Sequence, residues 1–363
     1  MTQSQHREVV ITGVGVVNAA VVGDSAALAA WLDAPTAASR SRVGQARPAV
    51  RLPETTLPSL IDAAEGRRLA RVCQLAIGAA RFAVGEAGLD AASGVGLVIG
   101  SELGDYTSTI AFADGYLARG PAGLSALLFP NTVMNTMAAT TAIAVATREL
   151  SLTINVPTVS GELAVARAAA AVASGRVDAV LAGGVDELDP LVAEMLDALG
   201  DDGVRGEGAA FVMLEAAATA RARGARILGR IAGSAWRALP ARPWGVGRRV
   251  ASVAVAEAQA RAGGIAPEWV YASASGDAPR DAWESRVLSA ALGPRRVPTT
   301  SLGALVGHHA GLGVLHVASA AWSAGSGRLP TADGAHVPVP RHAGLVHGLG
   351  RGGGHVALMV DAA

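Results

Sequence analysis

The amino-acid sequence predicts an α/β protein in which sheets and helices pack in layers. Short apolar runs that end in glycine recur along the chain, and stretches rich in alanine precede several of them. Apolar strands that alternate with helices are typical of sheets whose faces are covered by helices. Aromatic residues make up only 4% of the 363 residues, whereas Ala, Val and Gly are abundant. This composition favours close packing of helix on sheet over an aromatic-rich sandwich.

The first buried strand is predicted at Val9–Gly13, where a β-branched run reaches a glycine turn. Similar strands are predicted at Val95–Gly100 and Ala179–Gly184, each after a helical stretch rich in alanine. The apolar stretch Leu163–Gly184 contains charged residues, whereas a membrane-spanning helix needs about 20 nearly uncharged residues. It is therefore predicted to be a buried helix followed by a buried strand.

The second half of the chain is predicted to begin near residue 205. The loop Leu199–Gly206 is rich in Asp and Gly, and a strand at Ala209–Glu215 follows it, so we predict two units, 1–205 and 206–363. Later strands are predicted near Arg226–Gly233, Trp269–Ala274 and Gly352–Val360, and helices near Ala251–Gly263, Arg280–Leu292 and Ala310–Ala324. Surface loops rich in Pro, Arg and small residues are predicted at Ala34–Pro53 and Ser234–Gly247.

The charge balance excludes some classes of partner. Basic and acidic side chains number 30 each, and every basic one is Arg. Without a net positive field, binding to nucleic acid or to an anionic membrane has no electrostatic support. The single cysteine, Cys73, cannot form an internal disulfide, and no charged-then-apolar leader is seen at the N-terminus. We therefore expect a cytoplasmic protein.

One candidate functional residue lies at a predicted corner between a strand and a helix. The segment Ser151–Ala164 is a β-branched strand that runs into Pro157 and Thr158 before a helix beginning at about Val159. Helix N-terminal amides carry a partial positive charge that stabilises an anion, which suits a reactive group at Thr158. Alternatively, Thr158 is a plain N-cap, since Thr is a favoured cap and Glu162 lies in the first helical turn.

A glycine-flanked histidine pair, His308 and His309, leads into the helix near Ala310–Ala324. Imidazole carries protons near neutral pH, so the pair is a candidate for acid–base chemistry. Seven of the eight histidines lie at or after residue 308, which raises the possibility of a metal site. Adjacent side chains diverge, however, and no HxxxH or Cys/His set accompanies them, so neither a metal nor a cofactor is predicted.

Two further segments are ambiguous by themselves. Tyr271–Glu284 contains a strand that ends in Ser273–Gly276 and a polar loop, which a simple turn would explain. The tail His347–His355 is rich in glycine and could cradle a phosphate. Glycine next to a terminal strand more often indicates close approach of another backbone, and we favour that interpretation.

Taken in order, these segments resemble the β-ketoacyl synthase family of the thiolase-like fold across nearly the whole chain. The resemblance is carried by VVITGVGVV at Val9–Val17, VIGSELG at Val98–Gly104, FPNTVMNT at Phe129–Thr136, SLTINVPTVSG from Ser151, AVLAGGVDEL at Ala179–Leu188, GEGAAFVMLE at Gly206–Glu215 and ARGARILGRIAG at Ala222–Gly233. Their collinear order makes the resemblance specific. It implies two related halves in a five-layered α-β-α-β-α arrangement.

The resemblance also implies an active site that has lost most of its catalytic groups. In the family, a cysteine at a helix N-terminus attacks an acyl thioester, and two histidines and a lysine assist decarboxylative condensation. The residues at these positions are Thr158 for the cysteine, Ser275 and His308 for the histidines, and Gly303 for the lysine. Only His308 retains the family's residue type. Arg351 stands where the family has a bulky apolar gate residue.

The family includes subunits without the cysteine, the chain length factors of type II polyketide synthases. They form a heterodimer with an active ketosynthase α-subunit and limit the length of the chain in its tunnel. The resemblance implies this role, with an acyl carrier protein reached through the complex, and the chain also resembles divergent β-subunits that serve polyene-type polyketides. The implied tunnel or interface residues are Tyr106, Ile110, Phe112, Tyr116, Phe129, Asn131 and Arg351. The aromatic residues among them would equally suit ordinary core packing.

Two alternatives remain open at this point. The chain could be a divergent acyltransferase or cyclase that uses His308 with Thr158 or Ser160. It could instead be a homodimeric acyl-binding protein without catalysis. In each case the few charges of the surface suit a large permanent interface, since such interfaces are more apolar than ordinary surface.

Overall fold

The computed structural model describes residues 6–89, 94–251 and 253–363. Within these ranges, eleven of the strands form one mixed sheet, which consists of two parts joined by only three residue pairs of β1 and β9. The N-terminal part contains, in spatial order, β1 (Val9–Asn18), β8 (Gly208–Ala216), β7 (Ala179–Asp186), β5 (Val95–Gly100) and β6 (Ser151–Ile154), with β2 (Val22–Gly23) paired to β1. The C-terminal part contains β9 (Gly229–Ala238), β15 (Gly354–Asp361), β14 (Gly344–Leu349), β10 (Val270–Ala272) and β11 (Thr299–Thr300).

The two parts of the sheet repeat the same topology. In each, the spatial order of the strands is first, fifth, fourth, second, third along the chain. In each, the first two pairings are antiparallel and the last two are parallel. The prediction of two related halves is confirmed. The boundary of the repeat lies between β8 and β9, because β8, the strand after the loop Leu199–Gly206, pairs within the N-terminal part of the sheet. The division into units 1–205 and 206–363 stays a prediction.

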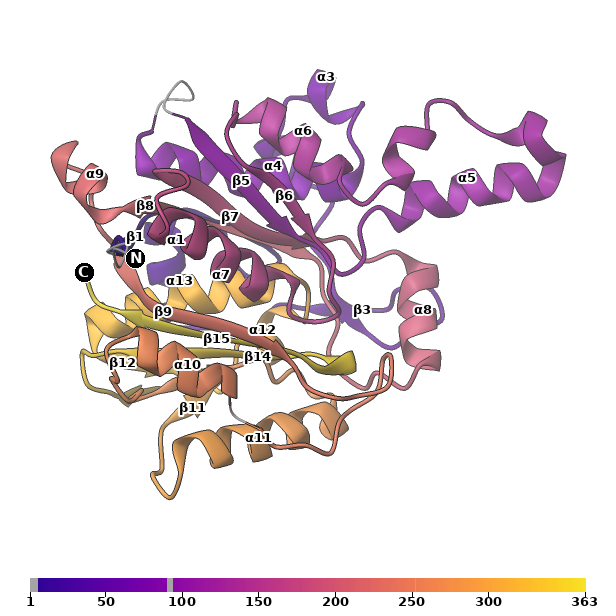
Figure 1. Ribbon diagram of the computed structural model, residues 1–363. Helices are drawn as coiled ribbons and strands as arrows, with labels where there is room; N and C mark the ends of the chain where they lie inside the picture. Colours follow the sequence, from indigo (N-terminus) through magenta and orange to yellow (C-terminus); the bar gives the residue numbers. More distant parts are fainter. Residues whose placement is uncertain (1–5, 90–93, 252) are drawn as a thin grey trace, which may run out of the picture.

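Helices form three layers around and between the two parts of the sheet (Figure 1). On the outer side of the N-terminal part lie α4 (Arg71–Ala87) and, packed on it, α6 (Thr136–Ala144). Between the two parts lie α7 (Ser160–Ala173) and α13 (Gly311–Ser326), which contact strands of both. On the outer side of the C-terminal part lie α10 (Val253–Arg261) and α11 (Ala278–Leu292). The five-layered thiolase-like arrangement is therefore confirmed.

Small residues permit the central layer to pack closely. A Cβ atom at Gly161 of α7 would lie 2.0 Å from the carbonyl oxygen of Ala310, and one at Gly184 of β7 would lie 2.2 Å from the same atom. No side chain fits at such distances, so the start of α13 can approach both elements only because glycine is present. This contact brings the loop that carries His308 next to the start of α7.

Two sequence-based predictions were wrong in detail. Ser234–Gly247 was predicted to be a loop, but its first five residues continue β9 and pair with β15; the Pro- and Arg-rich composition begins only after Ala238. Strand β14 was not predicted, because its two glycines and His347 had the composition of a turn. The predicted loop Ala34–Pro53 contains two short strands, β3 (Arg40–Ser41) and β4 (Ala49–Val50).

The other elements are short. They are α1 (Ser25–Asp33), α2 (Leu57–Leu60), α3 (Ala63–Gly66), α8 (Pro190–Ala198), α9 (Ala217–Ala222), α12 (Gly303–Val306), β12 (Arg328–Pro330) and β13 (His336–Pro338). In the three ranges that the structure describes, no helix has the length and apolar character needed to cross a membrane.

A helical arm extends away from the body of the molecule (Figure 1). It comprises α5 (Tyr106–Arg119) and the 3-10 helices η2 (Gly120–Gly123) and η3 (Phe129–Thr132). No residue of α5 is buried. Contiguous exposed apolar surface of this kind marks interaction sites. The large apolar side chains exposed on residues 106–134, hereafter the arm, are Tyr116, Leu117, Leu124, Leu127, Phe129, Val133 and Met134.

Candidate active-site region

Thr158 lies at a strained corner between β6 and α7. Its φ angle is +71°, and the amide of Val159 donates a hydrogen bond to the carbonyl of Pro157 at 2.8 Å. A three-residue turn with positive φ is strained, and a β-branched residue rarely adopts it. Val159 is the N-cap of α7 and no side chain caps the helix, so the interpretation of Thr158 as a plain N-cap is wrong. Such strain is typical of functional sites.

Ser160, the other hydroxyl considered as a nucleophile, is used by the backbone around it. Its Oγ accepts a hydrogen bond from the amide of Val156 at 2.8 Å and lies 2.6 Å from the carbonyl of the same residue. It also lies 3.1 Å from the carbonyl of Ser101, and the side chain is fully buried. A nucleophilic role for Ser160 would break contacts that hold this corner together.

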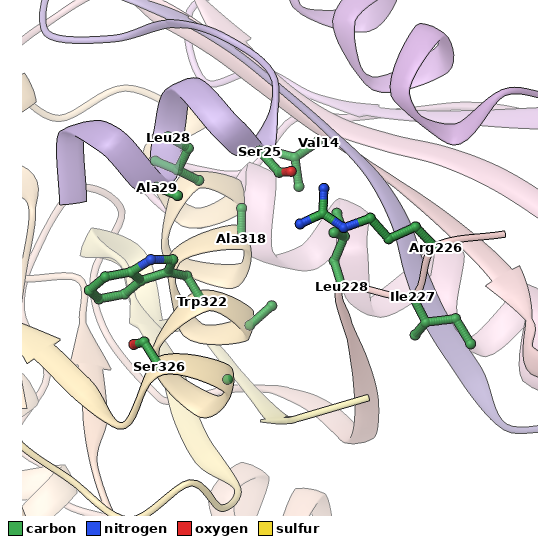
Figure 2. A pocket seen from close by; sticks show the side chains of 12 residues that line it. Val14, Ser25, Leu28, Ala29, Arg226, Ile227, Leu228, Ala318, Trp322 and Ser326 are labelled. Atoms are coloured by element: carbon green, nitrogen blue, oxygen red, sulfur yellow. The ribbon is translucent and has the colours of Figure 1, made fainter. Parts of the chain in front are cut away.

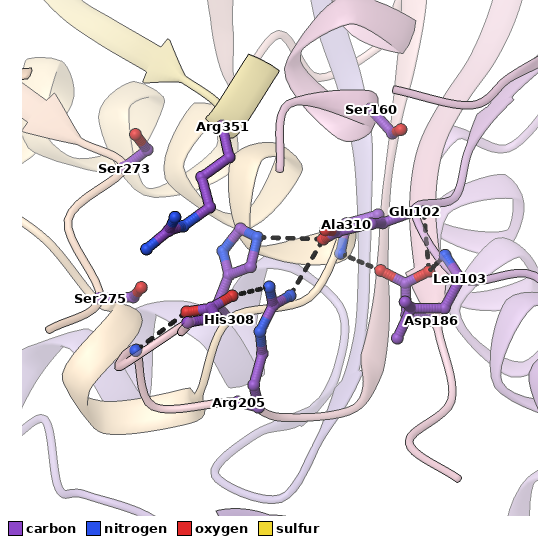
Figure 3. Close-up of polar contacts among 12 residues, drawn as sticks. Glu102, Leu103, Ser160, Asp186, Arg205, Ser273, Ser275, His308, Ala310 and Arg351 are labelled. Atoms are coloured by element: carbon purple, nitrogen blue, oxygen red, sulfur yellow. Dashed lines mark hydrogen bonds and ion pairs between the residues drawn. The ribbon is translucent and has the colours of Figure 1, made fainter. Parts of the chain in front are cut away.

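His308 is buried in the loop before α13. Its amide donates to the carbonyl of Val204 at 2.7 Å, and its carbonyl accepts from the amide of Gly206 at 3.0 Å. The Nε2 atom lies 3.5 Å from Oε2 of Glu102, which follows β5 (Figure 3). Burial lowers the pKa of His308 although Glu102 opposes the shift. The imidazole is therefore neutral near pH 7 and able to accept a proton.

Glu102 belongs to a buried group of charges that also includes Arg205 and Asp201. Arg205 Nη1 lies 3.1 Å from Glu102 Oε2 (Figure 3). Arg205 Nη2 donates to Asp201. Burial would raise the pKa of Glu102, but the positive charge of Arg205 and the neighbouring His308 lower it to about 2. We call these four residues the His308 cluster. It joins three segments that are far apart in the sequence.

Asp186 fixes the position of the loop that carries His308. At the end of β7, its Oδ1 accepts hydrogen bonds from the Ser101 hydroxyl at 2.8 Å and from the Leu103 amide at 2.9 Å. Its Oδ2 accepts from the Ala310 amide at 2.7 Å (Figure 3). One carboxylate therefore links the loop after β5 to the start of α13.

Ser275 and Gly303 lie close together. The resemblance implies this, because it assigns both positions to the same site. Ser275 is buried, and its Oγ accepts a hydrogen bond from Arg280 Nη2 at 3.0 Å. A Cβ atom at Gly303 would lie 2.6 Å from the carbonyl oxygen of Ala274 and 3.2 Å from the Ser275 Cα. A lysine at position 303 therefore cannot fit unless the backbone moves.

This close approach gives a stability prediction. Gly303→Ala is expected to lower the free energy of unfolding by about 1–3 kcal/mol, because the new methyl group meets a backbone carbonyl that cannot rotate away. Gly85→Ala in α4 is the matched control, since a Cβ atom added there would meet no other atom within 4 Å. That control should be neutral or stabilising. Equal effects of the two changes in urea denaturation would contradict the contact.

Arg351, which the resemblance places at the position of a gate residue, clamps three segments together. It forms a bidentate pair with Asp277, with Nε to Oδ2 at 2.6 Å and Nη2 to Oδ1 at 2.8 Å. It also donates to the carbonyls of Trp244 at 3.1 Å and Gly200 at 2.8 Å. The residue before it packs on Thr158, because a Cβ there would lie 3.2 Å from the Thr158 Cβ. A buried clamp therefore lies beside the corner, at the position where the resemblance implies an apolar gate.

A buried chain of polar side chains lies beside this clamp and was not predicted from the sequence. Glu284 Oε1 accepts a hydrogen bond from the Ser273 amide at 3.0 Å and lies 2.7 Å from Nδ1 of His347. The Nε2 atom of His347 lies 2.9 Å from the Nε2 atom of His355. The antiparallel pairing of β14 with β15 brings these histidines together. Recognition of that hairpin in the glycine-rich tail would have revealed the pair.

Glu162 is a second buried group that was not assigned a chemical role. Its carboxyl group lies between α13 and β14, where Cβ atoms at Gly313 and Gly348 would come within 2.1 and 2.9 Å of it. Its Oε2 atom has no hydrogen-bond partner among the described residues. Burial raises the pKa of Glu162 to about 8. The side chain is therefore protonated at neutral pH.

The tunnel or interface candidates lie mainly on the arm and outside the core of the chain. Tyr106, at its base, packs on a small apolar cluster of the body. Phe112 and Phe129 contact each other, with ring centroids 6.1 Å apart. Tyr116 is 50% exposed and Phe129 is 59% exposed. Ordinary core packing is thus the wrong interpretation for the α5 candidates beyond Tyr106. Besides Tyr106, the tunnel or interface candidates on the arm are Ile110, Phe112, Tyr116, Phe129 and Asn131.

The site does not coincide with the cavity shown in Figure 2. This cavity of about 350 Å³ lies between α1, the segment before β9 and α13, and its lining includes Leu28, Arg226 and Trp322. None of the candidate site residues lines it. Within the described ranges, no group of three or more His, Cys, Asp or Glu side chains is arranged to hold a metal ion.

The comparison with known families shows which family the chain belongs to. The family described as "Beta-ketoacyl synthase, N-terminal domain" matches residues 6–220. The chain belongs to the β-ketoacyl synthase family. The polyketide beta-ketoacyl synthase 1 of Streptomyces virginiae is 30% identical over 315 residues, which is 76% of this chain and 74% of the relative. The tetracenomycin ketoacyl synthase alpha subunit of Streptomyces glaucescens is 26% identical, over 94% of this chain and 90% of its own.

Solved structures agree with this family assignment. A structure described as the ishigamide ketosynthase/chain length factor matches with a TM-score of 0.85 and 20% identity. The match covers 99% of this chain and 100% of that one. A type II polyketide ketosynthase in complex with its acyl carrier protein matches with a TM-score of 0.83 and 19% identity, over 99% and 100% of the two chains. At these identities, the likeness supports the fold.

Proposed function

We propose that this chain is a non-condensing, chain-length-factor-like subunit that pairs with an active ketosynthase α-subunit in a type II polyketide synthase. The observation that carries the proposal is a family scaffold whose nucleophile corner holds Thr158. A threonine hydroxyl is a far weaker nucleophile than a thiolate and needs a base of its own. The lysine position is closed by the packing of Gly303 on Ala274, so the remaining catalytic groups do not replace the missing ones.

The single cysteine does not supply the missing thiolate. Cys73 lies in α4, on the outer side of the N-terminal part of the sheet, and is buried in an apolar cluster. Burial raises the pKa of its thiol to about 11. A thiol in such surroundings is inert.

The arm supports the pairing with a second subunit. Its large apolar side chains remain exposed in the described part of this chain, and obligate dimer interfaces resemble a core divided between two subunits. Relatives of the same fold include a ketosynthase/chain length factor and a ketosynthase seen with its acyl carrier protein. By analogy, the acyl carrier protein would be reached through the complex, with the arm forming part of the wall of the acyl tunnel.

The proposal is tested by expressing the chain alone and together with a type II ketosynthase α-subunit that retains its cysteine and both histidines. We expect a heterodimer in size-exclusion chromatography and elongation of malonyl carrier protein only by the complex. Elongation by the purified chain alone would refute the proposal. A stable homodimer that ignores the ketosynthase and binds acyl groups would instead support the acyl-binding alternative.

A divergent acyltransferase or cyclase is the second candidate function. It is favoured by the strained corner at Thr158 and by the neutral, buried His308. An acyl ester that forms on the chain from several acyl thioesters, and is lost in Thr158→Ala, would establish it. Failure to trap such an ester by mass spectrometry would reject it. Ser160→Ala is less informative, because it also removes contacts of the corner.

The proposed tunnel wall leads to a product prediction. In the complex, Phe112→Ala is expected to lengthen the polyketide products by at least one extension unit, because the ring that packs on Phe129 is removed. The measurement is the mass distribution of the products. Val337→Ala, a partly exposed apolar change in the C-terminal half, is the control. An unchanged distribution for Phe112→Ala would exclude Phe112 from the wall.

A further inference from the structure

A polar pocket lies at the base of the arm. Its volume is about 300 Å³, and its lining includes Asp105, Glu187, Asp189, Arg51 and Arg71. The first of these caps α5, since its Oδ1 accepts a hydrogen bond from the Ser108 amide at 2.8 Å. The pocket therefore opens where the arm leaves the body.

The two arginines of the pocket are already paired with carboxylates outside its lining. Arg71 donates to Glu207 at 2.7 and 3.0 Å and to Glu54 at 2.9 Å. Arg51 lies 3.5 Å from Glu207 and 3.7 Å from Glu54. Two positive charges are thus balanced by two negative ones. Arg71 attracts Glu187 only at longer range, and Arg51 Nε has no hydrogen-bond partner among the described residues, so neither arginine forms an ion pair with the acidic side.

The acidic side has hydrogen bonds but no cation. Glu187 Oε2 accepts from the Val72 amide at 2.8 Å, and Asp189 Oδ2 accepts from the Thr107 hydroxyl at 3.0 Å. The ion pairs of residues 6–89, 94–251 and 253–363, defined within 4.0 Å, include none with Asp105, Glu187 or Asp189.

Two of these carboxylates are also incompletely hydrogen-bonded. Asp105 Oδ2 and Glu187 Oε1 are buried atoms without a partner in the described structure, and the side chains belong to residues only 5% and 3% exposed. An unpaired buried carboxylate is costly and its ionised form needs a cation. Burial, and then the charge of Asp105, raises the pKa of Glu187 to about 7. The pocket is incomplete without a positive group.

We propose that this pocket receives the guanidinium or ammonium group of a basic side chain of the partner subunit. The inference rests on the proposed function, because it takes the arm as the interface. The pocket is continuous with that surface: Thr107 and Ser108 of α5 line it, and the exposed apolar residues follow on the same arm. A chain seated on the arm would pass the mouth of the pocket. The planar guanidinium of Arg fits two carboxylates better than the ammonium of Lys.

The pocket thus adds a specific contact to an otherwise apolar interface. An apolar surface alone discriminates poorly among partners, whereas buried charges favour a partner that supplies the opposite charge in the right place. A second subunit without a basic side chain at this position would leave the two carboxylates buried and unpaired. The pocket would therefore select between the cognate ketosynthase and other copies of the fold.

The test uses the double variant Asp105→Asn/Glu187→Gln, which retains the side-chain acceptors of the Ser108 and Val72 amides. The matched control is Asp333→Asn/Glu268→Gln, which removes one solvent-accessible carboxylate of each kind from the C-terminal half. The dissociation constant of the heterodimer with the co-expressed ketosynthase is measured by sedimentation equilibrium. We expect at least tenfold weaker binding for the double variant, with no loss of thermal stability of the isolated chain, and unchanged binding for the control.

A second measurement tests the pocket on the isolated chain. The probe is the peptide acetyl-Gly-Arg-Gly-amide, observed by saturation-transfer NMR, with and without Mg²⁺. Saturation transfer to the wild type that disappears in the double variant and persists with Mg²⁺ supports the inference. The absence of saturation transfer to the peptide overturns the inference. Displacement of the peptide by Mg²⁺ also overturns it and indicates a metal site instead.

The outcomes separate the inference from the proposed function. If the heterodimer forms as tightly with the double variant as with the wild type, the pocket inference is overturned and the pairing stands. If the wild type forms no heterodimer, the proposed function fails. The inference that a basic side chain of the partner enters the pocket is then overturned as well.

Discussion

Replacement of Arg205 by methionine is expected to lower the free energy of unfolding by about 3–5 kcal/mol. The reason is that Glu102 and Asp201 would remain buried without their cation, and an uncompensated buried charge is strongly destabilising. Methionine retains most of the buried aliphatic stem, so the loss reports mainly on charge. Urea denaturation followed by circular dichroism at pH 7 provides the measurement.

The matched control for this prediction is Arg47→Met. Arg47 lies 3.1 Å from Asp197 and 3.0 Å from Asp202, so it has two carboxylate partners as Arg205 has. Its side chain is 48% exposed, however, against 9% for Arg205. Exposed ion pairs contribute about 0–1 kcal/mol, and we expect a loss within that range. Similar losses for the two variants would show that burial of the His308 cluster does not matter.

The pH dependence gives the same prediction a second readout. The pKa of Glu102 is lowered to about 2 in the folded chain, so its stabilising contribution is present above its unfolded pKa of about 4.5. That contribution is lost as the pH falls from about 4.5 toward 2. The difference in stability between wild type and Arg205→Met should therefore shrink over this interval. A difference independent of pH would mean that packing, not charge, is responsible.

The sequence contained enough information for the layered fold because most of its strands are continuous apolar runs. Strands such as β5 and β7 are buried on both faces, so their sequences consist of apolar residues and glycine without a polar interruption before the last residue. β14 was missed because the polar His347 interrupts its short apolar run and because Gly344 and Gly348 leave only three apolar side chains in it. Both glycines have structural reasons, since a Cβ at Gly344 would overlap the Trp269 ring and one at Gly348 would approach Glu162.

The candidate site was predictable residue by residue but not as an arrangement. Thr158 and His308 stand out in their segments, yet neither segment reveals the side chains around them. The partners Glu102 and Arg205 come from a strand end and a loop more than 90 residues away from His308 in the sequence. The Arg351 clamp depends in the same way on Asp277. Long-range pairs of this kind need the three-dimensional arrangement.

Under the proposed function, the packing around the positions of the missing catalytic groups would oppose their restoration. Gly303 packs on Ala274, and Arg351 is held in a buried bidentate pair. Restoring only the nucleophile, as in Thr158→Cys, would therefore leave the chain without the lysine and one histidine. Groups that act as a unit are not redundant, so such a variant should not condense. The scaffold is consistent with a role that depends on shape and contact.

Glu162→Gln is expected to make the chain more stable than the wild type in mildly alkaline solution. Burial raises the pKa of Glu162 to about 8, far above the unfolded value near 4.5. The folded state therefore binds a proton that the unfolded state releases, and the stability associated with it is complete below about pH 4.5 and lost as the pH rises through 8. Each unit of pKa difference corresponds to about 1.4 kcal/mol. Glutamine has no proton to lose, so this part of the pH dependence disappears.

The measurement is the free energy of unfolding between pH 5 and pH 9 for both proteins. At pH 5 the two should differ little, because the carboxyl group is neutral in the folded chain and the pH is still close to the unfolded pKa of about 4.5; above pH 8 the variant should be more stable by a few kcal/mol. Glu187, whose pKa burial raises to about 7, titrates equally in both proteins and cancels in the difference. Glu149→Gln, an exposed change, is the control and should follow the wild-type curve. Parallel curves for Glu162→Gln and wild type would show that Glu162 is ionised in the folded chain, which would require a cation beside its unpartnered Oε2 atom.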